Sequence, residues 1–248
     1  MAELNRYPRP NVAVDLALMT VLPAEGRTAV GRLGILLQPV DDAWALPGRF
    51  LRPQQTMEDA VADVLGIKVG LRITPSRLTL LGVFDDPARD PRAWTMSLAH
   101  ALALPADELE SAQGELVGVD LQGRPRPKRP LLYDHADIVS AAVAAIRARY
   151  ERRPDPDGLL AGPFTLAELR AVHEAVLGEP LLRDTFNRRM TPHLSPVLER
   201  DGSPAVRSSG GRPAQLYLTR QQRQLSDDER RRLLLPRDQR PRGRTRGN

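Results

Sequence analysis

Several absences narrow the function of this 248-residue chain before any motif is considered. It contains no cysteine, which excludes disulfides, thiolate metal ligands and a cysteine nucleophile. No apolar run approaches the roughly 20 residues that cross a bilayer, and the N-terminus lacks the apolar stretch of a secretory signal. Aromatic residues make up only 4%, but the hydrophobic fraction of 41% suffices for a buried core. We expect a soluble, cytoplasmic protein of one large domain, or of a larger and a smaller one.

Lysine is also scarce, and the positive charge is unevenly placed. Only Lys68 and Lys128 are lysines among 36 basic residues, and the formal net charge is +5. Residues 1–150 carry 17 basic and 18 acidic side chains, residues 183–220 carry 7 and 3, and residues 221–248 carry 9 and 4. Clustered basic charge is typical of polyanion binding, although arginine-rich tails are often only solvated. We expect residues 221–248 to be a disordered tail that does not read DNA sequence.

The pattern over residues 8–150 predicts a mixed α/β domain. Thr56 and Asp59 form a capping box that opens an amphipathic helix, and a second helix starts at Asp134 and ends near Tyr150. Closely spaced prolines place residues 123–130 in a loop. Strands are expected at apolar runs, the first with one buried acid, Asp15: residues 12–21, 34–38, 78–84 and 94–104.

A second, smaller unit follows a segment with linker composition, residues 151–163. Thr165 and Glu168 form a capping box for a helix that runs to Leu177, with Phe164 and Leu169 placed for a hydrophobic staple. After a glycine-containing turn, a second helix is expected over residues 181–190. Its buried face is predicted to hold Leu182, Phe186 and Met190. A basic Gly/Ser loop and a strand at residues 215–219 complete the unit, residues 164–220.

Two helices joined by a short turn and followed by a hairpin with a basic tip are the layout of a winged helix-turn-helix. Such a unit places its second helix in the DNA major groove and its wing on phosphate or in the minor groove. The alternative is a small helical pair that serves as a dimerisation or lid element. The candidate DNA-binding residues are Arg183, Asp184, Thr185, Asn187, Arg188 and Arg189 on the helix, and Arg207, Ser208 and Arg212 on the wing.

Particular segments carry a resemblance to a known family. Residues 44–53, Trp-Ala-Leu-Pro-Gly-Arg-Phe-Leu-Arg-Pro, followed by a helix ending in Val69-Gly70-Leu71, resemble the Nudix domain. Residues 89–92, 133–136, 164–169 and 211–217 resemble the Nudix-related transcriptional regulators of the NrtR type, in which a Nudix-like sensor precedes a winged helix. The resemblance covers about residues 10–220. It implies an α+β fold, a Nudix-like mixed-sheet α/β/α sandwich followed by a winged helix-turn-helix domain.

The Nudix signature is degenerate in this chain. Where the signature has Gly, Glu, Arg-Glu and Glu-Glu, the chain has Arg49, Gln55, Asp63-Val64 and Ile67-Lys68. In Nudix enzymes those glutamates bind the divalent metal that orients a diphosphate for attack by water. Val64 and Ile67 are expected to pack instead, and Lys68 would repel a metal. We expect no catalytic residue and no metal; the alternative is a Nudix-type hydrolase of a nucleoside diphosphate derivative.

The resemblance implies that the cleft binds a nucleotide-type effector, typically ADP-ribose, which weakens DNA binding. The candidate phosphate contacts are Arg49, Arg52, Arg89 and Arg92, since a guanidinium partly replaces a metal's charge. Two other interpretations stay open. In the first, Arg89 and Arg92 brace a loop by pairing with the acids Asp85, Asp86 and Asp90. In the second, Arg49 occludes the site.

The leading hypothesis is a homodimeric transcriptional regulator, a repressor that binds a palindromic operator in double-stranded DNA. The four histidines, His100, His135, His173 and His193, have no paired metal-ligand spacing and are expected to be structural or surface residues. A further hypothesis is a ligand-free scaffold that acts by protein contact.

Overall fold

The computed structural model describes residues 7–23, 31–72, 78–208, 213–220 and 222. Its centre is an eight-stranded sheet in which β1 and β6 run parallel and the other neighbours pair antiparallel. The strand order is β5-β6-β1-β2-β7-β8, with β3 paired to β2 and β4 to β1. The strands are β1 Asn11–Leu22, β2 Arg32–Val40, β3 Ala43–Ala45, β4 Gly48–Phe50, β5 Thr79–Phe84, β6 Thr95–Ala103, β7 Glu115–Val119 and β8 Pro125–Arg126.

All four predicted strands are present, and β3, β4, β7 and β8 are additions. The segment 123–130 was expected to be a loop throughout, but Pro125 and Arg126 pair with β7 at the edge of the sheet. An edge position tolerates proline, because a proline there can leave its missing N–H on the unpaired side of the strand. The prediction of a loop is therefore wrong for these two residues.

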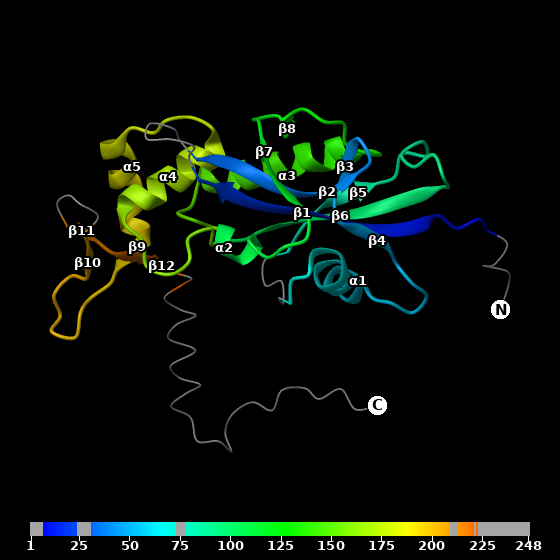
Figure 1. Ribbon diagram of the computed structural model, residues 1–248. Coiled ribbons are helices and arrows are strands. Elements are labelled where there is room, and N and C mark those ends of the chain that lie inside the picture. Colours follow the sequence, from blue (N-terminus) through cyan, green and yellow to red (C-terminus); the bar gives the residue numbers. More distant parts are fainter. Residues whose placement is uncertain (1–6, 24–30, 73–77, 209–212, 221, 223–248) are drawn as a thin grey trace, which may run out of the picture.

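The sheet is covered on both faces, with α3 on one face and α1 on the other (Figure 1). Strand β1 lies in the middle, so its side chains alternate between two cores: Ala17 and Met19 face α3, whereas Leu16 and Leu18 face α1. A strand buried on both faces has a nearly continuous apolar sequence, which explains the run in β1. The helices of this part are α1 Met57–Asp63, α2 Ala106–Leu109 and α3 His135–Tyr150.

The helix that starts with the Thr56–Asp59 capping box changes its winding after Asp63. Residues Val64–Val69 form a π-helical turn, η2, which ends at Gly70 in the left-handed conformation. Wider winding brings residues five apart onto one face, so Val64 and Val69 are both buried. Ile67 is turned outward and is 63% exposed. The prediction that Ile67 packs is wrong for this reason, whereas Val64 packs as expected.

The C-terminal part consists of two helices and two short two-stranded sheets. The capping box of Thr165 and Glu168 is present at the start of α4, and Phe164 and Leu169 are buried together with Phe186. The predicted strand at residues 215–219 is divided into two: β11 pairs with β10, and β12 pairs with β9. The elements are α4 Leu166–Leu177, α5 Arg183–Met190, a 3-10 turn η3 Thr191–His193, β9 Leu194–Pro196, β10 Val206–Arg207, β11 Ala214–Gln215 and β12 Tyr217–Thr219.

One residue of α5 is placed differently from the prediction. Phe186 and Met190 are buried as expected, but Leu182 is 80% exposed. Helix α5 begins at Arg183, and Leu182 is its N-cap in an extended conformation. Helical spacing therefore does not apply to Leu182, and its assignment to the buried face is wrong.

The segment predicted as a linker is packed against both parts of the chain. The carboxylate of Asp155 is buried and accepts hydrogen bonds from the Tyr150 hydroxyl at 2.7 Å and from the Leu159 N–H at 2.7 Å. The ring of His173, on α4, lies edge-on to Tyr150, with centroids 5.0 Å apart, and to Phe186 of α5, at 5.1 Å. Burial lowers the pKa of His173 to about 4. The end of α3, this segment and both helices of the C-terminal part thus share one buried junction.

Helix α4 belongs to two cores at once. Val172 and Val176 pack in the core between the sheet and α3, and Leu169 packs with Phe186 and Met190. The C-terminal part is therefore attached to the sheet by a shared helix. Among the described residues, no helix is long and apolar enough to cross a membrane.

Candidate functional site

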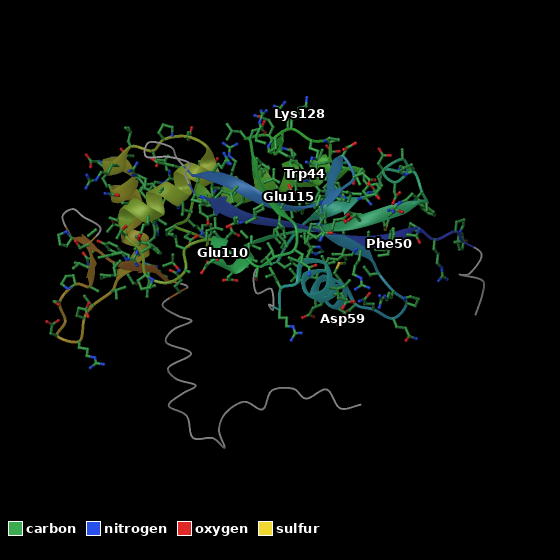
Figure 2. All side chains as sticks on the ribbon, in the orientation of Figure 1. Trp44, Phe50, Asp59, Glu110, Glu115 and Lys128 are labelled. Atoms are coloured by element: carbon green, nitrogen blue, oxygen red, sulfur yellow. The ribbon has the colours of Figure 1, made fainter. Side chains whose placement is uncertain are left out.

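A cavity of about 390 Å³ opens beside β1, β4 and the start of α3. Its volume is within the range typical of small-molecule sites. Gly48 is required beneath it, because a Cβ there would collide with the carboxylate of Asp15. Phe50, labelled at the end of β4 in Figure 2, lines the cavity and is 44% exposed. The charged and aromatic lining residues are Asp15, Arg49, Phe50, Lys68, Arg89, Asp90, Arg92, Tyr133 and His135.

The floor of the cavity is a buried polar network centred on Asp15. The Ser97 hydroxyl donates to its carboxylate at 2.6 Å, the Arg89 guanidinium lies 3.3 Å away, and Nε2 of His135 is 3.7 Å away. Burial by itself would raise the pKa of Asp15, but His135, Ser97 and Arg89 outweigh it and hold this pKa below its usual value. Nδ1 of His135 accepts a hydrogen bond from the Leu46 N–H at 3.0 Å.

Arg89 is the main charge of this network. Its guanidinium donates to both carboxylate oxygens of Asp134, at 2.8 and 2.6 Å, and its side chain is only 3% exposed. Burial tends to lower the pKa of Arg89, and the acids Asp134 and Asp15 raise it above its usual value. The acids that Arg89 holds are therefore not those anticipated, Asp85 and Asp86; only the Asp86 carbonyl oxygen is involved, as acceptor for the Arg89 N–H.

Arg92 and Arg49 lie at the rim, each paired with an acid. Arg92 donates to both oxygens of Asp90, which lowers the pKa of Asp90, and its guanidinium lies 4.8 Å from the centre of the Tyr133 ring. Arg49 pairs with Asp63 at 2.5 Å. The Arg92–Asp90 pair agrees with the bracing interpretation, while Arg49 lines the cavity and leaves it open.

The four predicted effector residues are thus only partly brought together. Arg49, Arg89 and Arg92 line the same cavity, and Arg52 is outside its lining. The lining residues that sequence reasoning did not propose include Lys68, Tyr133 and His135. Tyr133 and His135 stood in a motif quoted for the resemblance, but nothing in their spacing indicated that they face β1. Among the described residues, no group of three or more His, Asp or Glu side chains is suited to hold a metal.

Helix α5 presents most of its predicted DNA-binding side chains to solvent. Arg183, Asp184, Thr185 and Arg188 are exposed, and Asn187 is half-buried. Arg183 and Asn187 also line a cleft of about 400 Å³ between the start of α4 and strand β11. A basic, exposed helix face beside such a cleft suits the backbone and base edges of DNA.

Two predicted arginines are engaged within the protein. Arg189 donates to the Glu151 carbonyl oxygen at 2.5 Å, which ties the end of α5 to the junction. Arg207, on β10, donates to Oε1 of Glu168 at 2.6 Å and to the Pro163 carbonyl oxygen at 2.9 Å. Ser208 is exposed, whereas Arg212 and the arginine-rich tail lie outside the described residues.

Both parts of the chain match known proteins, in the same order. Residues 158–218 match the family model of the NrtR DNA-binding winged helix domain. The ADPR responsive transcriptional repressor NtrR of Acinetobacter baylyi is 30% identical over 85% of this chain and 82% of its own length. The crystal structure of Shewanella oneidensis NrtR complexed with a 27mer DNA is 25% identical, covers 84% of this chain and 93% of that one, and has a TM-score of 0.63.

Most of the chain also shares its fold with a MutT/nudix family protein from Enterococcus faecalis. That structure has a TM-score of 0.67 at 22% identity and covers 88% of this chain and 90% of its own. The expected fold class is therefore confirmed: a Nudix-like mixed sheet between helices, followed by a winged helix. Because the match to the Acinetobacter repressor spans both parts, the chain belongs to the NrtR family of Nudix-related transcriptional regulators.

Proposed function

We propose that this protein is a transcriptional repressor that binds operator DNA through its winged helix and leaves it when ADP-ribose occupies the cavity. The observation that carries the proposal is the presence of two separate basic sites. Exposed Arg183 and Arg188 lie on α5, and a cavity lined by Arg49, Lys68 and Arg92 lies beside β1. A DNA-bound relative and an ADP-ribose-responsive relative support the two assignments.

Helix α3 runs from the cavity to the junction that holds the winged helix. Its first residue, His135, lines the cavity, and its last, Tyr150, contacts His173 of α4. Sixteen helical residues span about 24 Å, so a displacement at the cavity end is carried along a rigid rod to the junction. This arrangement gives an effector a route to the recognition helix without any contact between effector and DNA.

The assembly and the location belong to the same proposal. One winged helix reads about one half-site, so two copies of the chain bound to a palindromic operator give specific recognition. We propose a homodimer in the cytoplasm, with residues 8–150 as the sensor domain, 151–163 as the junction and 164–220 as the DNA-binding domain. The matched winged-helix range, residues 158–218, lies close to the last of these.

We also propose that the protein does not hydrolyse ADP-ribose. Asp63, where the signature has arginine, is paired with Arg49, and Lys68 stands where the signature has a glutamate. Incubation with ADP-ribose and Mg²⁺ or Mn²⁺, followed by chromatography for AMP, tests this directly. We expect no AMP above the level of a protein-free control, and steady turnover would support the hydrolase instead.

Gel-shift assays test the regulatory role. The purified protein is incubated with DNA fragments from upstream of this gene and of its neighbours. ADP-ribose is then added in increasing amounts. We expect a specific shift with at least one fragment, which ADP-ribose reverses and ribose 5-phosphate does not. A specific shift that ADP-ribose leaves unchanged would contradict the effector assignment, and no specific shift would contradict the operator assignment.

A further inference from the structure

The four cations that line the cavity differ in their partners. Arg49, Arg89 and Arg92 each lie in an ion pair with a carboxylate, at 2.5, 2.6 and 2.8 Å respectively. Lys68 also lines the cavity, and no carboxylate among the described residues pairs with it. Most of the positive charge of the cavity is therefore already neutralised, and the Lys68 ammonium is the charge left for a ligand.

The backbone fixes the position of Lys68. Its carbonyl oxygen accepts a hydrogen bond from the Gln38 side-chain amide at 2.8 Å, which ties η2 to β2. The next residue, Val69, is buried, and Gly70 ends the turn in the left-handed conformation. These neighbours hold the Cα of Lys68 at the cavity while its long side chain remains exposed.

The same region does not suit a divalent metal. The signature's glutamates are replaced, and Oδ2 of Asp63, at the signature's arginine position, accepts hydrogen bonds from Arg49 and from Gln55 at 2.8 Å. Hard cations need several oxygen ligands, and the described residues provide no cluster of them. An ammonium lining the same cavity adds repulsion. The residues present here thus favour an anion over a metal.

We propose that Lys68 is a phosphate-binding residue that takes the place of a metal, so that the cavity binds the diphosphate of a nucleotide without a divalent cation. The proposal deepens the proposed function and rests on it. An ammonium supplies three hydrogen-bond donors and a full charge to phosphate oxygens. Arg92 and Arg49, at the rim of the cavity, also contact the phosphates when the ligand displaces Asp90 and Asp63 from them.

Calorimetry with ADP-ribose as the probe tests this inference on the full-length chain. Titrations are carried out in buffer with EDTA and in buffer with Mg²⁺. Wild-type protein is expected to bind with the same affinity in both. Lys68→Ala is expected to weaken binding by about 10- to 100-fold, the usual effect of losing a charged hydrogen bond. Lys68→Arg keeps the charge and is expected to retain more affinity than Lys68→Ala.

The chain offers a matched control in its other lysine. Lys128 is exposed, lies outside the cavity lining, and is well separated from Phe50 in Figure 2. Lys128→Ala is expected to bind ADP-ribose as wild type does. Thermal melts of all variants establish that they are folded. Because Lys68 is exposed and its side chain forms no hydrogen bond or ion pair with the described residues, we expect its substitution to leave the fold intact.

The outcomes separate the two levels of the proposal. If wild type binds ADP-ribose and Lys68→Ala binds equally well, the assignment of Lys68 is overturned and the proposed function stands. If wild type binds only with Mg²⁺, the metal-free site is overturned. If wild type binds in neither buffer, the effector assignment fails and the inference about Lys68 fails with it.

Discussion

His135 and Tyr150 are the two ends of one helix, so α3 contacts the cavity with its first turn and the winged-helix junction with its last. Nδ1 of His135 accepts a hydrogen bond from the Leu46 N–H, and the Tyr150 hydroxyl donates one to the Asp155 carboxylate. Both ends are fixed by hydrogen bonds to buried partners. Helix α3 therefore connects the cavity to the winged-helix junction, with defined attachments at each end.

Tyr150→Phe is predicted to weaken communication between the sites. The change removes the hydroxyl that donates to Asp155 at 2.7 Å and leaves the ring that packs on His173. We expect a loss of about 1–2 kcal/mol in the free energy of unfolding. The ratio of operator affinities without and with ADP-ribose should also fall, measured by fluorescence anisotropy. A lower melting temperature with an unchanged ratio would contradict the role of this contact in communication.

The stability of the protein is predicted to fall as the pH drops from about 6.5 to 4. The pKa of His173 is lowered by burial from 6.5 to about 4, so the folded state keeps a neutral imidazole over this range while the unfolded chain binds a proton. Stability then falls with decreasing pH by up to about 1.4 kcal/mol per pH unit. Urea unfolding at several pH values measures this.

His173→Gln is expected to be less stable at neutral pH and to show a shallower pH dependence over the same range. His193→Gln is the matched control, because His193 is exposed. An equally steep dependence in His173→Gln would assign the effect to other groups.

Arg188→Ala is predicted to weaken specific operator binding strongly while the fold is retained. Arg188 is exposed on α5, and a good contact between arginine and a base edge contributes about 1–3 kcal/mol of discrimination. Gel shifts with operator and scrambled DNA measure the loss. Arg124→Ala, which changes an exposed arginine in the β7–β8 turn, serves as control. Unchanged affinity of Arg188→Ala would remove the recognition-helix assignment.

Arg207 is predicted to position the wing. Its guanidinium is held by Glu168 and the Pro163 carbonyl oxygen, so we expect Arg207→Ala to weaken DNA binding with little change in its salt dependence. Loss of a direct phosphate contact would instead reduce the slope of log K against log salt by about 0.9. Glu168→Gln keeps an acceptor for the helix cap and removes the ion pair, and it should reproduce the effect. A reduced slope in Arg207→Ala alone would assign Arg207 to phosphate.

Local patterns were sufficient to predict most of the fold. Both capping boxes, the four long strands and the buried pair Phe186 and Met190 depend on residues close together in the sequence. Ile67 and Leu182 were misplaced because a π-turn and a helix start two residues later than predicted altered the local geometry. Sequence spacing carries no signal for either change.

The site was harder to predict, because its contacts join distant parts of the chain. Asp134 was predicted to begin a helix, yet its carboxylate binds Arg89, 45 positions earlier. Lys68 was recognised as a substitution in the Nudix signature, but only the fold places it in the same cavity as Arg92. Comparison with the Nudix signature therefore identified the residues that depart from it, and the three-dimensional arrangement shows what surrounds these residues.

The central claim is that ADP-ribose binding in the cavity and operator binding by the winged helix weaken each other. Thermodynamic linkage requires the two effects to be equal, so one measurement tests the claim. ADP-ribose affinity is measured by calorimetry for the free protein and for the protein saturated with operator DNA. Bound operator should lower ADP-ribose affinity by the same factor by which ADP-ribose lowers operator affinity, typically 5- to 150-fold for coupled sites. Equal ADP-ribose affinities in the two titrations would contradict the account.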